Sequence, residues 1–371
     1  MSSLKYIPFF IAAVLTWSSC QTNSSQSPQN QDQQSKDTIS YALEEFNIPN
    51  TSIRALEALN DSTVWFAGSN GYWGYTENNG QDWHIHQMQL DTVFPEFRSI
   101  AITDNGFIYL VSIAHPAAIF KSTDLGQNWK KVYQDTSENA FFDAIEFWND
   151  EQGILLGDAV HQCFHIATTN DGGNTWQRVN CSQLPPALEN ENPFAASNTN
   201  VSLSDSHTWF VTGGKSKSRV YHSSNYGLDW DVEETPIVSG QTMTGIYSVQ
   251  FISPNIGMIA GGNWENVTEK NNHMALTRDG GQTWKVLNDN SMNGYISCIQ
   301  FVPGSNGKEI LALSGRSRGG ISQMYYSSNM GESWQKWNNT NYLAIQFASP
   351  NAAWISGNEK IGKLTLNKGQ R

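Results

Sequence analysis

The sequence predicts an all-β fold, a seven-bladed β-propeller that an N-terminal strand closes. One observation is the pattern Ser/Thr-x-Asp/Asn-x-Gly-x-x-Trp, which recurs six times. Its tryptophans lie 46, 47, 54, 54 and 50 residues apart, the spacing of propeller blades. The other observations are seven short apolar runs that end in a small residue, and an N-terminal run that resembles an outer strand.

The recurring pattern predicts a tight turn between two strands of each blade. Its Asp or Asn accepts hydrogen bonds from turn amides, its Gly supplies a positive φ, and its Trp opens the next strand and packs between sheets. The copies span residues 76–83, 122–129, 169–176, 223–230, 277–284 and 327–334. We call them Asp boxes.

The apolar runs predict seven blades, one more than the boxes. They span residues 64–68, 107–112, 153–157, 209–213, 257–261, 310–315 and 354–357. The seventh unit continues through residues 361–366, and no box or outer strand follows it. Residues 40–49 resemble the run after each Trp, so we expect them to pair with the seventh sheet and to remove its open edge.

One domain accounts for residues 40–371, because they divide into seven units of roughly blade size. The formal net charge is −12, and no basic patch of the kind that binds phosphates is present, so we expect no nucleic-acid partner. We expect a monomer.

The N-terminus predicts a lipoprotein. Lys5 and the apolar run at residues 6–15 have the form of a signal peptide over residues 1–19, and Cys20 ends a loose bacterial lipobox. Residues 20–39 are polar and of low complexity, as a disordered tether is. We expect a lipid anchor on Cys20 in the cell envelope, at the outer membrane facing the periplasm, with surface display or ordinary cleavage beside an incidental Cys as alternatives.

Cys163 and Cys181 flank the third box and face each other if its strands pair in register. An oxidising envelope permits a disulfide there, and two free thiols are the alternative. His161 and His165 alternate with Cys163, which is superficially a metal pattern, but no further ligand completes it. We expect neither a metal nor a cofactor.

The candidate binding site lies on the face away from the boxes, where the other loops gather around the central opening. We expect the box carboxylates to be structural and the loops to form a cup with aromatic walls. The candidate ligand- or partner-binding residues are Arg98, Phe141, Asp143, Asp158, Phe194, Ser197, Tyr247, Trp264, Glu265 and Arg316. The alternative to a binding role is a structural one, in which each carboxylate caps a turn and each phenylalanine packs in the core.

Four stretches carry a family resemblance: residues 141–144, 157–158, 194–197 and 245–248. With the boxes, they make residues 40–371 similar to the photosystem II stability/assembly-factor-like propellers (BNR repeats), in the non-photosynthetic bacterial lipoprotein branch often labelled oxidoreductase. The resemblance implies a non-catalytic binding or assembly propeller, tethered in the cell envelope, whose partner is a protein or a glycan.

The alternative function is a sialidase-like or other BNR-repeat glycoside hydrolase. Sialidase chemistry needs three arginines that clamp a carboxylate, a Tyr nucleophile activated by Glu, and an acid/base Asp. The motif that supplies the first arginine is missing, and Phe97-Arg98-Ser99-Ile100 resembles it only weakly. An oxidoreductase is less favoured still, since neither a dinucleotide fingerprint nor a haem-attachment motif is present.

Overall fold

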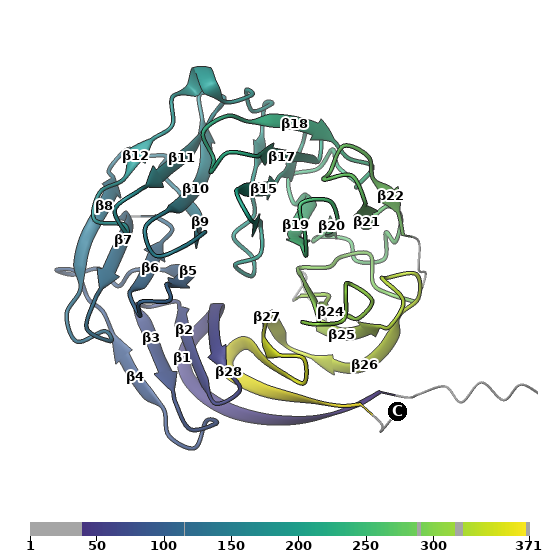
Figure 1. Cartoon of the computed structure of the whole chain (residues 1–371), viewed down its shortest axis with the longest axis horizontal. Helices are drawn as coiled ribbons and strands as arrows, with labels where there is room; N and C mark the ends of the chain where they lie inside the picture. The colour runs from purple at the N-terminus through teal and green to yellow at the C-terminus, as the bar shows by residue number, and fades with distance from the viewer. Residues whose placement is uncertain (1–38, 115, 288–290, 316–321, 369–371) are drawn as a thin grey trace, which may run out of the picture. The chain divides into compact units, whose positions relative to one another are not determined.

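The computed structural model describes residues 39–371 except 115, 288–290, 316–321 and 369–371, and it leaves the side chains of residues 338–340 undescribed. The signal peptide, nearly all of the tether, Cys20 and Arg316 therefore lie outside the described residues. Residues 39–371 form one compact unit. Its sheets follow one another around a ring (Figure 1), so the predicted all-β propeller is confirmed.

Four of the sheets have four antiparallel strands each, ordered as the chain runs. The second unit has β5 (Phe97–Ile102), β6 (Ile108–Ser112), β7 (Ala117–Ser122) and β8 (Lys130–Asp135), and the third has β9 (Phe142–Phe147), β10 (Gly153–Val160), β11 (Cys163–Thr169) and β12 (Gln177–Arg178). The fourth has β14 (Val201–Ser204), β15 (His207–Val211), β17 (Arg219–Ser223) and β18 (Asp231–Glu234), and the sixth has β23 (Cys298–Phe301), β24 (Ile310–Leu313), β25 (Ser322–Ser327) and β26 (Gln335–Thr340).

Two larger sheets have six strands each. One joins β13 (Glu191–Asn192) and β16 (Gly213–Gly214) to β19 (Thr244–Phe251), β20 (Gly257–Asn263), β21 (Met274–Thr277) and β22 (Lys285–Val286). The other has the order β27 (Tyr342–Ser349), β28 (Ala352–Asn367), β1 (Ser40–Asn60), β2 (Thr63–Gly68), β3 (Tyr72–Thr76) and β4 (His84–Gln87).

Counted as hydrogen-bonded sheets of the described residues, the ring has six members, whereas the sequence predicts seven blades. The physical reason is the long strand β1, which belongs to two neighbours. Its residues 40–47 pair with residues 360–367 of β28, and its residues 53–60 pair with β2. Asn50, with a φ of 65°, marks the change of partner. Of the predicted segment 40–49, residues 40–47 pair with the end of the chain in this joined sheet.

The six Asp boxes adopt one local structure. In each, the Ser or Thr hydroxyl accepts a hydrogen bond from the backbone amide of the box Gly at 2.9–3.0 Å, and it donates one to the Asp or Asn side chain. The Oδ1 of that Asp or Asn accepts a hydrogen bond from the backbone amide four residues further along the chain, at 2.9–3.0 Å. Every box Gly has a positive φ. Hydrogen bonds from the Thr283 hydroxyl and amide lower the pKa of Asp279 to about 2. The box carboxylates thus satisfy turn amides.

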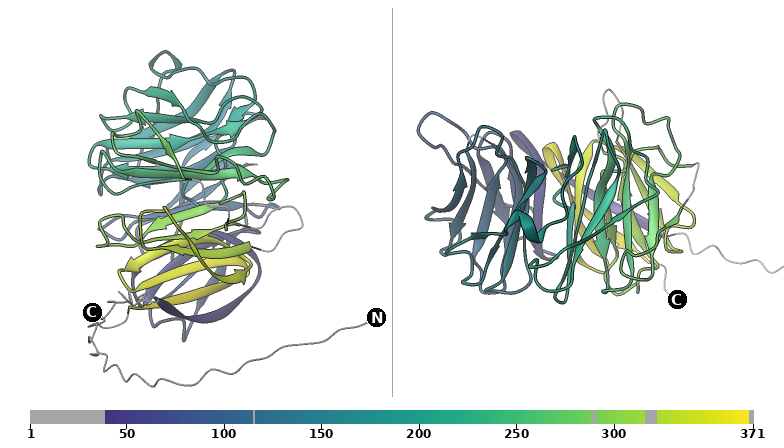
Figure 2. Two further views of the ribbon diagram at one scale, coloured as in Figure 1. Left: turned by 90° about the vertical axis from the view of Figure 1, so that its right-hand side faces the viewer. Right: turned by 90° about the horizontal axis from the view of Figure 1, so that it is seen from above.

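The hydrophobic core lies between neighbouring sheets, which stand face to face in the side views (Figure 2). Where the chain ends meet, Ile48 packs with Phe66, Trp354 and Ile361, and all four are fully buried. Within the described residues the one helix is η1 (Cys181–Gln183), and none is long and apolar enough to cross a membrane.

Candidate functional site

Five innermost strands share an irregularity, one extra residue near the end of the pairing with the next strand. The extra residues are Arg54 in β1, Arg98 in β5, Asp143 in β9, Tyr247 in β19 and Leu343 in β27. A β-bulge breaks the in-and-out alternation of a strand and re-aims the side chain of the extra residue. Side chains of contrasting chemistry therefore occupy equivalent positions around the ring.

Glycines on the second strand make room for these bulges. A Cβ on Gly157 would lie 2.4 Å from the Phe141 carbonyl oxygen, and one on Gly357 would lie 2.3 Å from the Asn341 carbonyl oxygen. Any other residue would force the inner strand away. The small residue that ends most of the apolar runs in the sequence is thus a signature of the bulge.

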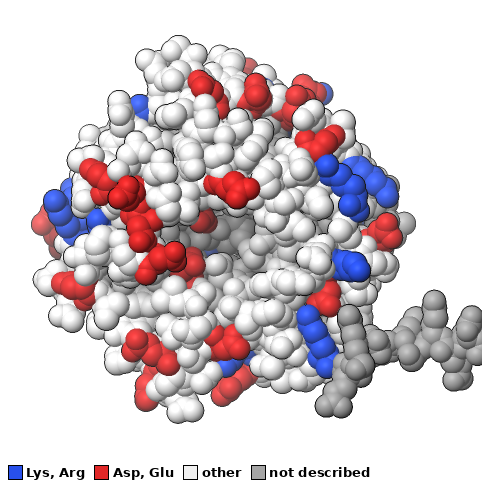
Figure 3. All heavy atoms as spheres, viewed as in Figure 1, with Lys and Arg blue, Asp and Glu red and all other residues white. Residues whose placement is uncertain are grey.

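Residues 194–199, which we call the plug, contact the inner strands of several blades. They precede β14 but are held by groups on four other inner strands or at their starts. Arg54 Nη1 donates to the Ala196 carbonyl (3.0 Å), Arg98 Nη1 to the Ala195 carbonyl (3.4 Å), Ser197 Oγ to the Ser297 carbonyl (2.7 Å) and the Val249 amide to the Thr199 carbonyl (2.8 Å). The space-filling view shows a hollow at the centre of the ring (Figure 3).

Aromatic rings cluster at the Phe194 end of the plug. Phe194 stacks on Tyr247 with the ring centroids 4.2 Å apart, and Tyr295 meets Tyr247 edge-on at 4.8 Å. Trp264 packs against the same cluster. The Tyr247 hydroxyl donates to the Met243 carbonyl at 2.9 Å. This tyrosine is buried and hydrogen-bonded, and it is part of an aromatic wall.

Two carboxyl groups lie on another side, where β9 pairs with β10. Asp143 is completely buried, and neither of its carboxyl oxygens has a hydrogen-bond donor. Asp158 is half-buried, and its amide donates to the Phe141 carbonyl at 2.9 Å. Burial raises the pKa of Asp158 to about 7. Burial, together with Asp158, raises the pKa of Asp143 well above its usual range, although the charge of Arg98 opposes this.

A second pair of carboxyl groups, Glu57 and Glu146, lies on β1 and β9. Both are partly accessible yet surrounded by protein atoms, and burial raises the pKa of Glu57 to about 8. Burial and the neighbouring Glu57 raise the pKa of Glu146 well above its usual range. The nearest polar contact is the Gln346 carboxamide, 3.5 Å from Glu57 Oε1.

The structure brings most of the predicted site residues together around the plug, some of them in other settings than an open cup. Asp143 and Ser197 are buried, and Phe194, which packs on Tyr247, belongs to the plug. Phe194 is partly exposed. The other residues that keep partial or full exposure are Arg98, Phe141, Asp158, Trp264 and Glu265, and we call these five the mouth. Arg316 is outside the described residues.

Arg54 was not predicted as a site residue. It stands in Ile53-Arg54-Ala55, at the start of an inner strand, as Arg98 does in Phe97-Arg98-Ser99. Aligning the starts of the inner strands would have found it.

The pattern of His161, Cys163 and His165 forms no metal centre. Cys163 is joined to Cys181 in a disulfide. His165 Nδ1 lies 3.1 Å from Asp135 Oδ2, and its Nε2 lies 2.9 Å from the Tyr133 hydroxyl. In the described part of the chain, no three His, Cys, Asp or Glu side chains are close enough to hold a metal ion.

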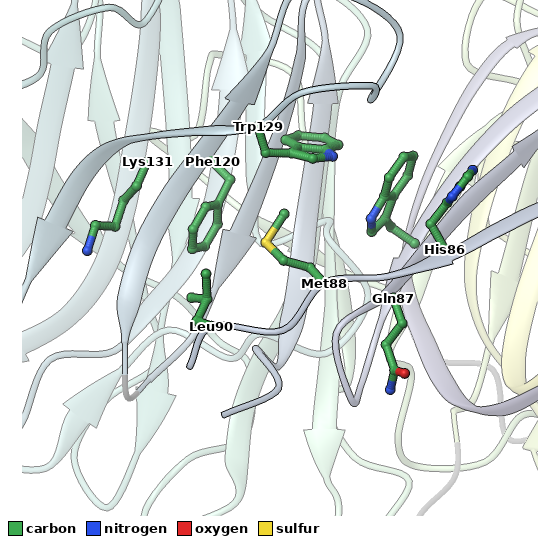
Figure 4. Close-up of a pocket in the computed structure, with 8 residues that line it drawn as sticks. His86, Gln87, Met88, Leu90, Phe120, Trp129 and Lys131 are labelled. Carbon is green, nitrogen blue, oxygen red and sulfur yellow. The ribbon is translucent and has the colours of Figure 1, made fainter. Parts of the chain in front are cut away.

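A cavity of about 460 Å³ lies away from the mouth, between the outer strands of the first and second units. Met88 projects between Phe120 and His86 in it (Figure 4). Trp73 stacks on His86 at 4.5 Å and meets Trp129 edge-on at 5.1 Å. These rings belong to the packing between two units, so we attribute the cavity to the divergence of their outer edges.

Comparison with known proteins supports the architecture. No family model and no curated protein matches the sequence. Similar solved structures include YCF48 bound to a D1 peptide (17% identity, 88% of this chain, 97% of that one, TM-score 0.63) and YCF48 from Cyanidioschyzon merolae (14%, 88%, 98%, 0.60). Virginiamycin B lyase from Staphylococcus aureus is also similar (16%, 88%, 100%, 0.62). At these identities the likeness shows the β-propeller fold and does not choose between a binding protein and an enzyme.

Proposed function

We propose that this protein is a non-catalytic binding propeller of the bacterial cell envelope, of the photosystem II assembly-factor-like, Asp-box type, and that it takes a protein partner at the mouth. The observation that carries the proposal is the arrangement around the plug, where two arginines, a buried carboxyl group and an aromatic wall converge. A peptide bound to YCF48 is a precedent for this fold holding a protein segment.

The arginines argue against the hydrolase alternative. A sialidase needs arginines that are open to the carboxylate of a sugar. Arg54 and Arg98 donate instead to carbonyl groups of the plug, at 3.0 and 3.4 Å. The plug therefore engages Nη1 of both arginines, and no described contact favours sugar hydrolysis.

The proposal includes a seven-blade interpretation of the ring. In it, the joined sheet acts as two four-stranded blades, one made of residues 53–60 with β2, β3 and β4. The other consists of β27, both halves of β28 and residues 40–47. The Leu366 amide donates to the Asn351 carbonyl at 2.8 Å, which supports a hairpin within β28.

Lipidation of Cys20 completes the proposal. It would anchor the chain at the outer membrane, facing the periplasm, and residues 21–38 would let the propeller reach a partner there. The sequence of the first twenty residues is its support.

The test is a pull-down from detergent-solubilised envelopes with the full chain as bait, beside a glycan array. The Glu265→Lys variant changes an exposed mouth residue, and Glu332→Lys makes the same change in an exposed Asp-box turn. We expect Glu265→Lys to capture at least tenfold less partner than the wild type, and Glu332→Lys to capture as much as the wild type does. Equal capture by both variants, or binding of glycans alone, would contradict the proposal.

A further inference from the structure

The carboxyl group of Asp143 has no hydrogen-bond partner among the described residues. Its carboxyl group is fully buried, and both oxygens lack a donor. Buried polar groups in folded proteins are almost always hydrogen-bonded, and a buried carboxylate without a partner is strongly unfavourable. Asp143 therefore stays neutral in the free protein or receives a donor from outside the described chain.

Asp158 connects this buried group to the mouth. It is half-buried and near enough to Asp143 to influence its ionisation. The Asp158 backbone is fixed by its amide bond to the Phe141 carbonyl. A ligand group that enters beside Asp158 thus comes near a second, buried carboxyl group on the adjacent strand.

The basic side chains nearby have other partners. Arg98 donates to the Ala195 carbonyl and lies 3.7 Å from Glu96, and Arg54 donates to the Ala196 carbonyl. Across the described residues, no ion pair involves Asp143 or Asp158. The charge of Arg98 opposes the rise of the Asp143 pKa, but Arg98 forms neither an ion pair nor a hydrogen bond with that carboxyl group.

We propose that the Asp143–Asp158 pair receives the cationic end of a lysine or arginine side chain from the protein partner. This inference rests on the proposed function and names the chemistry of its partner. An ammonium group brings several donors and one positive charge, which suits two adjacent carboxyl groups. A metal ion suits them less, since the described chain offers no third His, Cys, Asp or Glu ligand.

Charge over the molecule favours the same partner. The formal net charge is −12, and acidic side chains border the central hollow while most basic ones lie toward the rim (Figure 3). Such a field attracts basic segments over acidic ones and accelerates their association.

The experiment titrates the full chain with a peptide of six lysines, and with the same peptide acetylated on every side chain, by calorimetry at low salt. We expect the lysine peptide to bind at least tenfold more tightly than its acetylated form. The Asp143→Asn/Asp158→Asn variant should lose about tenfold in affinity. The matched control, Glu233→Gln/Glu332→Gln, removes two exposed charges and should bind as the wild type does.

Equal weakening in the paired and the control variants would show general charge attraction and overturn the proposal. Binding of Ca²⁺ that depends on Asp143 and Asp158, without binding of the lysine peptide, would also overturn it in favour of a metal site. Near-UV circular dichroism checks the fold, and the single Asp158→Asn variant at the half-buried position repeats the test if the double variant unfolds.

Capture of the envelope partner separates this inference from the proposed function. If the paired variant captures the partner as well as the wild type does, the propeller binds but the carboxyl pair is not the recognition element. If neither captures any partner while the lysine peptide binds as expected, the carboxyl pair recognises cations and the proposed function fails.

Discussion

Replacing Ile48 by alanine tests how the two ends of the chain close the ring. Ile48 is fully buried beside Phe66, Trp354 and Ile361, which come from both ends of the chain. Truncation of a buried isoleucine costs about 2–5 kcal/mol. Unfolding entropy of about 2.1 cal/mol/K per residue, applied to residues 39–371, converts this into a fall in Tm of roughly 3–7 °C.

The assay is thermal unfolding followed by circular dichroism, with Ile85→Ala as the matched control. Ile85 lies on β4 and is 38% exposed, so the same truncation there should shift the Tm by less than about 1 °C. If Ile48→Ala and Ile85→Ala melt together with the wild type, the closure that we infer from β1 and β28 is refuted.

Three further predictions concern closure, anchoring and acid stability. Deleting residues 40–49 should lower the Tm by more than Ile48→Ala does, because residues 40–47 pair with β28. Deleting residues 21–38 should leave the Tm unchanged, and equal Tm values for the two deletions would contradict the closure of the ring. Cys20→Ser should move the protein from the membrane fraction to the soluble fraction, and unchanged membrane association would exclude the lipid anchor. Burial lowers the pKa of His165 from 6.5 to about 4, so the folded state resists protonation and stability falls as the pH drops from 6.5 to 4, by up to about 1.4 kcal/mol per pH unit. Urea midpoints at pH 7 and pH 5 should therefore differ less in His165→Gln than in the wild type, and an equal difference would show that His165 does not govern this loss.

The Asp-box turns could be predicted because their structure is local. The bonds of one box, such as those from Thr169 to Gly173 and from Asp171 to Thr175, span only four residues. The pairing of residues 40–47 was predictable for another reason, since they resemble the run after each box Trp and an open sheet edge favours such a partner. The first and last sheets are joined because β1 is hydrogen-bonded along its length to both β28 and β2. No local sequence pattern indicates this joining.

The setting of the site residues could not be predicted, because it depends on bulges and on distant contacts. Strand alternation assigns side chains to faces, and an extra residue such as Asp143 escapes that rule. The plug is held by Arg54 and Arg98, which lie 142 and 97 residues away from their partners in the chain. The sequence indicated that these residues lie near the centre of the ring, but it gave no sign that Ser197 and Asp143 are buried.

The most direct test of the account is the affinity of the captured partner for two variants. Arg98→Ala/Asp143→Ala alters the centre of the ring, and Asp171→Ala alters an Asp box whose carboxylate accepts the Thr175 amide at 2.9 Å. We predict that the first variant binds at least tenfold more weakly, and that the folded fraction of the second binds normally although its Tm is lower. Loss of binding in Asp171→Ala alone would contradict the account, because it would place the function at the box turns.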